Sequence, residues 1–236
     1  MNSLIAGRHL LKKGFSRGDL DTMYAARTIM EGALSDVDIS LWGHYYVGLA
    51  DYRIANVLLA QGKKRKAEAS EHLEKAVEHL QNAVDSVDDG EELNEAAAEI
   101  YALLSHVYGR QISLSPIKGI YLGPKSKSVL RRAERLAPGN PRVVLSSAIG
   151  YLNTPRFFGG NKEKAMQRLR RAAKLFARGK PADPIDPNWG HSDTYTWMGI
   201  AYLERDNRGA AREAFEKALE VDPDNRWARE MLSGDQ

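Results

Sequence analysis

The stretch that decides the fold is residues 192–225, which read SDTYTWMGIAYLERDNRGAAREAFEKALEVDPDN. Its first half carries aromatic, apolar and small residues at an i, i+3, i+4, i+7 spacing, which predicts one face of a helix: Tyr195, Met198, Gly199 and Tyr202. Its second half carries a stripe at i, i+4, i+7: Ala211, Phe215 and Ala218. The small residues let two antiparallel helices approach closely, and Pro223 stops the second helix because it lacks an amide hydrogen.

Weaker copies of this hairpin pattern fill the chain before residue 192. The first-helix stripe recurs three times, as Tyr45, Gly48, Leu49 and Tyr52, as Tyr101, Leu104, Ser105 and Tyr108, and as Val144, Ala148 and Tyr151. Stacked repeats of one supersecondary unit bury a continuous core, and terminal repeats are usually atypical. We therefore expect a single helical domain with these parts: a degenerate cap over 1–40, a stretched repeat over 41–92, repeats with inserted loops over 93–140 and 141–191, a standard repeat over 192–225 and a C-terminal cap over 226–236.

Two insertions interrupt the repeated pattern. Residues 112–128 contain four helix-breaking residues, Pro116, Gly119, Gly123 and Pro124. This composition predicts a structured loop rather than further helix. The second insertion, residues 154–160, joins a proline to two phenylalanines and two glycines. Its aromatic residues either form a lip over a groove or pack the loop onto the helices.

On these stripes the chain resembles bacterial tetratricopeptide-repeat proteins. The resemblance implies an all-α fold, a right-handed solenoid of antiparallel helix hairpins with loop insertions. It also implies a non-enzymatic scaffold that binds a protein or peptide in its concave groove.

Residues 45–53 and 157–165 further resemble segments of exported bacterial repeat proteins, among them the tetratricopeptide-repeat component associated with tripartite periplasmic transporters. This second resemblance implies an exported or periplasmic location with the signal segment removed; the cytoplasm is the alternative. It also implies an alternative function, a small-molecule-binding accessory protein of a bacterial transport system.

The charges of the chain divide into two blocks, although the formal net charge is only +3. Residues 68–99 hold eleven acidic residues against one lysine, and residues 125–180 hold fifteen basic residues against two acids. Such blocks are either solvated outer faces or contacts for an acidic partner, for anionic lipid headgroups or for a second copy of the chain. The chain has no cysteine, which excludes disulfides, thiolate metal sites and a cysteine nucleophile. It also has no apolar run long enough to span a membrane.

The sequence contains no motif that predicts catalysis or a bound cofactor, so we expect neither. His72 and His79 lie seven residues apart, but no third ligand is spaced to complete a metal site, so we expect two surface histidines. Residues 159–162, GGNK, lack the longer loop and the Ser or Thr of a phosphate-binding motif; we expect Asn161 to cap a helix instead. No recognised nucleic-acid motif accompanies the basic block, so we expect no nucleic-acid partner.

The resemblance places the first helix of each repeat along the concave surface. Side chains offset from the packing stripes are then the predicted partner-binding residues: Tyr46, Arg53, His106, Arg110, Arg142, Ser146, Asn153 and Trp197. Arginines mixed with aromatic residues suit a peptide with acidic groups. The loops add candidates for a lip: Phe157, Phe158 and Trp189. Self-association through the two charge blocks is an alternative.

Overall fold

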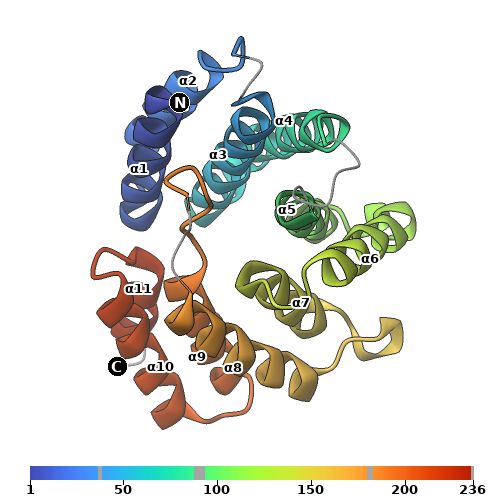
Figure 1. Ribbon diagram of the computed structural model, residues 1–236. Helices are drawn as coiled ribbons and strands as arrows, with labels where there is room; N and C mark the ends of the chain where they lie inside the picture. The colour runs from blue at the N-terminus through green and yellow to red at the C-terminus, as the bar shows by residue number, and fades with distance from the viewer. Residues whose placement is uncertain (37–38, 88–93, 180–182, 235–236) are drawn as a thin grey trace. The chain divides into compact units, whose positions relative to one another are not determined.

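The structure is a computed structural model that describes residues 1–36, 39–87, 94–179 and 183–234. Every regular element in these residues is a helix, which confirms the predicted all-α fold (Figure 1). The chain divides into two compact units, Met1–Ala137 and Pro138–Gln236, and each is described by itself. That the whole chain acts as one domain stays a prediction.

Unit 1 consists of three helical hairpins. Its helices are α1 (Asn2–Arg17), α2 (Leu20–Glu31), α3 (Ser40–Ala60), α4 (Lys66–Asp85), α5 (Asn94–Leu114) and α6 (Gly119–Leu136), with the short 3-10 helices η2 (Lys63–Arg65) and η4 (Pro116–Lys118). Each helix contacts the next one along the chain, the arrangement of a helical solenoid. In the first hairpin, a side chain on Gly7 or Gly14 would collide with Met30 or Met23 on the facing helix, so both glycines permit close packing.

Unit 2 consists of two hairpins and a last helix. Its helices are α7 (Pro141–Asn153), α8 (Lys162–Arg178), α9 (His191–Leu203), α10 (Arg208–Val221) and α11 (Arg226–Ser233), with the 3-10 helix η5 (Arg156–Phe158). An asparagine caps four of these helices by accepting hydrogen bonds from first-turn amides: Asn140, Asn161, Asn207 and Asn225. The prediction that Asn161 caps a helix is therefore confirmed.

The predicted loop over residues 112–128 is wrong. Helix α5 runs to Leu114, and α6 begins at Gly119 with Pro124 inside it. Pro116 stands at the start of η4, where the missing amide hydrogen costs nothing. Pro124 removes one hydrogen bond from the second turn of α6, and the helix still forms around the buried side chain of Leu122. The proline and glycine content of residues 112–128 therefore predicted a longer interruption of the helices than the structure has.

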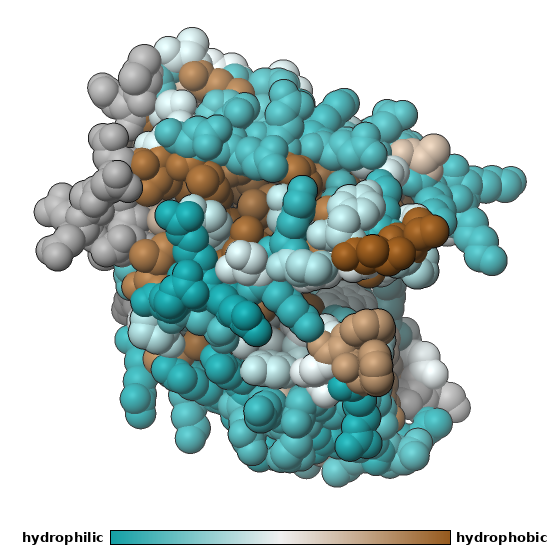
Figure 2. All heavy atoms as spheres, turned by 90° about the vertical axis from the view of Figure 1, so that its right-hand side faces the viewer, coloured by the Kyte–Doolittle hydropathy of each residue, from teal (hydrophilic) through white to brown (hydrophobic). Residues whose placement is uncertain are grey.

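The face drawn in Figure 2 is mostly hydrophilic, with hydrophobic side chains exposed in a few places. No helix within the described ranges combines the length and the apolar character needed to cross a bilayer.

Candidate functional site

A surface hollow of about 370 Å³ lies in unit 2 where the chain passes from α7 to α8. We call it the 151–162 hollow; its lining residues are Tyr151, Leu152, Asn153, Thr154, Pro155, Arg156, Gly160, Asn161, Lys162 and Glu204. All of these residues except Glu204, which follows the C-terminal end of α9, lie between residues 151 and 162.

Backbone hydrogen bonds fix the wall of this hollow. The amide of Asn161 donates to the carbonyl of Tyr151 at 3.0 Å, and the amides of Phe158 and Gly160 donate to the carbonyl of Pro155 at 2.9 and 3.1 Å. A side chain on Gly160 would overlap the carbonyl group of Thr154. The turn therefore requires glycine at this position.

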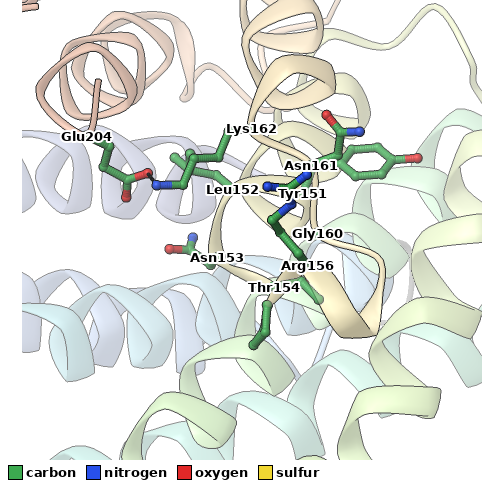
Figure 3. Close-up of a pocket in the computed structure, with 10 residues that line it drawn as sticks. Tyr151, Leu152, Asn153, Thr154, Arg156, Gly160, Asn161, Lys162 and Glu204 are labelled. Atoms are coloured by element: carbon green, nitrogen blue, oxygen red, sulfur yellow. Dashed lines mark ion pairs between the residues drawn. The ribbon is translucent and has the colours of Figure 1, made fainter. Parts of the chain in front are cut away.

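Charged groups line the hollow on one side. Lys162 Nζ lies 2.9 Å from Glu204 Oε2, and Figure 3 shows this pair on the same side of the turn as Asn153. Asn153 is exposed, and its side-chain amide donates to the carbonyl of Ile149 at 3.1 Å. The Arg156 guanidinium is exposed and makes no ion pair or hydrogen bond with the part of the chain that the structure describes. Lys162 is thus neutralised locally, whereas Arg156 presents its charge to solvent.

Two phenylalanines project from η5 beside the hollow. Phe157 is 92% exposed and Phe158 is 62% exposed, and their rings pack edge to face with centroids 5.3 Å apart. The exposure of both rings favours the lip over packing of the loop onto the helices, and the lip stays a prediction. Trp189 behaves oppositely: it is only 8% exposed, so it belongs to the core and cannot form part of an exposed lip.

The predicted partner-binding residues of unit 1 lie on α3 and α5 and are engaged internally. Tyr46 is fully buried, with its ring edge to face against Tyr45. Arg53 is buried with its guanidinium 4.6 Å from the ring centre of Phe15. Our placement of Tyr46 and Arg53 in an open groove is therefore wrong, because neighbouring helices cover the face of α3 that carries them.

The other two predicted residues of unit 1 are partly buried. Arg110 donates to Asn56 Oδ1 at 2.5 Å, and His106 Nδ1 lies 3.5 Å from the Tyr52 hydroxyl. Burial lowers the pKa of His106 to about 4, and the nearby Arg110 cation acts in the same direction. His106 is therefore neutral at pH 7.

The predicted residues of unit 2 lie on α7 and α9 and differ in exposure. Ser146 is buried and donates to the carbonyl of Arg142 at 2.7 Å. The Arg142 guanidinium lies 5.9 Å from the ring centre of Phe176. Trp197 is half-buried and packs edge to face against Trp227 at 5.1 Å. Of the eight predicted partner-binding residues, the 151–162 hollow includes only Asn153.

A buried polar cluster in unit 1 was missed by the sequence reading. Asp51 on α3 is fully buried, and its Oδ1 accepts from Arg27 Nε at 2.8 Å and from His72 Nδ1 at 2.6 Å. His72 Nε2 lies 3.2 Å from the Tyr24 hydroxyl, which donates to Glu68 at 3.0 Å. Our expectation that His72 is a surface residue is therefore wrong. The available signal was Asp51 directly after the apolar stretch Val47–Ala50 in α3.

A second histidine pair lies on the α3–α4 hairpin. Nδ1 of His44 and Nδ1 of His79 are 3.0 Å apart, and burial lowers the pKa of both side chains. Both rings are half-buried, so the predicted surface position of His79 is only partly right. Across the described ranges, no three His, Asp or Glu side chains gather in a way that could hold a metal ion.

Comparison with known proteins supports the fold. The family model described as "Tetratricopeptide repeat" matches residues 192–225. The HusA haemophore from Porphyromonas gingivalis is similar in structure, with 21% sequence identity and a TM-score of 0.59 over 80% of this chain and 92% of HusA. No curated protein matches in sequence.

Other solved structures match with lower TM-scores. YrrB, described as a TPR protein with an unusual peptide-binding site, gives 17% identity and a TM-score of 0.42 over 98% of this chain and 90% of YrrB. MamA gives 18% identity and a TM-score of 0.39 over 88% of this chain and 91% of MamA. The family-model match and the helices of the structure identify the chain as a protein with a tetratricopeptide repeat, at residues 192–225, in an all-α fold of helical hairpins.

Proposed function

We propose that the chain is a protein-interaction scaffold and that its unit 2 binds an acidic peptide segment at the 151–162 hollow. Folds of this kind typically serve as non-catalytic scaffolds, and that this chain is not an enzyme stays a prediction. We do not propose the small-molecule role, because no feature of the described residues favours it.

The observation that carries the proposal is the exposed pair Phe157 and Phe158 beside the hollow. Two neighbouring aromatic rings in water are costly to leave uncovered, and aromatic side chains are common anchors of protein interfaces. The turn that carries them is fixed by its own backbone hydrogen bonds, so little ordering would accompany binding. The rings therefore suit an apolar residue of a partner peptide.

Arg156 adds an exposed positive charge to the 151–162 hollow. Its exposed guanidinium follows Pro155 in the wall of the hollow, where it can form a bidentate pair with a carboxylate. The next helix adds to this positive field, since beyond the paired Lys162 the helix α8 carries Lys164, Arg168, Arg170, Arg171, Lys174 and Arg178 against the single acid Glu163. An acidic residue next to an apolar one is therefore the expected motif in the partner.

The test begins with peptides selected from a random phage-displayed library on the full chain, followed by fluorescence-anisotropy titration of a selected peptide. We expect selected peptides to pair Asp or Glu with an apolar residue. Phe157→Ala/Phe158→Ala should weaken binding by about thirtyfold and Arg156→Ala by about tenfold, the size of interface anchors. Affinity should also fall as salt rises.

The matched control is Arg212→Ala. Arg212 is also an exposed arginine of unit 2, with its side chain 68% accessible, but it pairs with Glu216 on α10 away from the hollow. Its replacement should leave the affinity unchanged. Equal losses of peptide affinity in Arg156→Ala and Arg212→Ala would mean that the peptide responds only to the net charge of the chain. No loss in the phenylalanine variant would refute the site.

A further inference from the structure

We infer that the turn between α5 and α6 docks unit 1 on an anionic lipid surface. The 3-10 helix η4 in this turn and the first residues of α6 carry three exposed hydrophobic side chains close together in sequence. Ile117 is 75% exposed, Ile120 is 79% exposed and Tyr121 is 54% exposed. We call these three residues the 117–121 tip. Exposed apolar residues are ordinary when scattered, but a cluster of two isoleucines and a tyrosine marks an interaction site.

The tip is held in place by the structure around it. The amide of Ser115 donates to the carbonyl of Gln111 at 3.0 Å, and the amide of Lys118 donates to the carbonyl of Ser115 at 2.9 Å. Leu122, the next residue after the tip, is buried with 6% exposure. The tip therefore projects from a fixed turn, and its exposure does not come from a loose loop.

Positive charge continues from the tip along the exposed side of α6. Lys125 lies one turn beyond Tyr121, Arg131 lies six residues after Lys125, and Arg135 lies one turn beyond Arg131; all three are exposed. Residues 112–136 hold six basic residues and one acid, Glu134. Lys118 lies inside the tip itself, with its ammonium 3.9 Å from the Glu74 carboxylate. The surface thus joins an apolar end to a basic side.

This combination fits a lipid surface better than a protein. Protein interfaces are depleted in lysine, whereas basic residues beside exposed apolar ones match anionic headgroups above a hydrocarbon layer. Tyrosine is common at the boundary between headgroups and hydrocarbon because its ring is apolar and its hydroxyl is polar. In this arrangement Ile117 and Ile120 enter the layer, and the basic side of α6 lies along the headgroups.

The experiment is co-sedimentation of the full chain with vesicles of phosphatidylcholine, with and without about one third phosphatidylglycerol. We expect binding to the anionic vesicles at low salt, a large decrease at high salt and weak binding to phosphatidylcholine alone. Ile117→Ser/Ile120→Ser should lower the partition coefficient at least about tenfold, and Lys125→Gln should lower it several-fold.

The matched control is Phe157→Ser/Phe158→Ser, which removes two exposed apolar side chains from unit 2. This variant should keep its vesicle binding, whereas it should lose the acidic peptide. The isoleucine variant should lose vesicle binding and keep the acidic peptide. The two proposals can therefore be refuted independently of each other.

Three outcomes would overturn the inference. One is no binding to anionic vesicles, and another is equal binding of the isoleucine variant and the original chain. The third is self-association without vesicles, detected by sedimentation velocity, that the isoleucine variant abolishes; the tip would then be a contact between copies.

Discussion

The α2–α4 region of unit 1 and the α9–α10 hairpin of unit 2 differ in what their helices bury between them. In the first, the buried carboxylate of Asp51 on α3 joins Arg27 of α2 to His72 of α4. In the second, α9 and α10 approach so closely that Gly199 lies against the ring of Phe215. The first region therefore adds a buried charge cluster to close packing, since a side chain on Gly48 would also collide with Leu80, whereas the second region relies on shape around Gly199.

The largest expected effect is from Asp51→Ala. The substitution leaves the Arg27 guanidinium and the His72 Nδ1 without their buried acceptor. Breaking a buried ion pair by removing one partner typically costs about 3–5 kcal/mol. We expect a loss of that order in the free energy of opening of α3 and α4, measured by hydrogen–deuterium exchange of the full chain.

The control for this prediction is Asp85→Ala, which removes an exposed acid at the end of α4. It should change the free energy of opening by no more than about 0.5 kcal/mol. If both alanine variants destabilise α3 and α4 equally, the Asp51 cluster does not hold this region together.

The second prediction concerns acid pH. His106 has a pKa of about 4 in the folded chain against 6.5 for an ordinary histidine, so the unfolded state binds more protons between these values. The stability of unit 1 should therefore be complete above about pH 6.5 and fall as the pH drops toward 4. His44 and His79 act in the same direction. For His106 alone the loss is on the order of 2–3 kcal/mol.

Urea unfolding of the full chain between pH 7.5 and about 4 measures this effect, with hydrogen exchange reporting on α5. His106→Gln removes the titrating ring and should flatten the decrease in unit 1. Unit 2 provides the internal comparison, since His191 has a pKa lowered by burial and should give a smaller decrease. A pH dependence that the glutamine variant leaves unchanged would exclude His106 as its source.

The helical hairpins could be predicted from the sequence because their signals are local. The stripe around Gly199, the Asp222–Pro223 stop and the cap at Asn161 each act within a few residues. The break predicted over residues 112–128 was wrong because Pro116 stands at the start of η4 and α6 continues through Pro124 in its second turn.

The candidate site was harder to predict because burial depends on distant neighbours. The sequence identifies which face of α3 carries Tyr46 and Arg53, but only the folded hairpins reveal that this face is covered. The same limit applies to Phe157 and Trp189, both aromatic residues in loops with glycine and proline. One is almost fully exposed and the other is buried. Sequence composition is alike in the two loops, and tertiary packing decides between them.

The smallest expected effect tests the role of shape in the α9–α10 hairpin. Gly199→Ala, inside α9, and Gly209→Ala, at the second residue of α10, make the same chemical change in helices; in a helix interior alanine is favoured over glycine by about 1 kcal/mol. A Cβ atom at Gly199 would overlap the ring of Phe215, which is only 1% exposed, whereas one at Gly209 has no neighbour within 4 Å.

We therefore expect opposite signs from this matched pair. Gly209→Ala should stabilise α10 by about 0.5–1 kcal/mol, and Gly199→Ala should destabilise the hairpin by about 1–3 kcal/mol because the ring must move within a filled core. Hydrogen exchange of α9 and α10 in the full chain measures both values, with unit 1 unchanged as the reference. Stabilisation by both alanines would show that the Phe215 ring moves freely. The α9–α10 hairpin would then not depend on the close fit between Gly199 and Phe215.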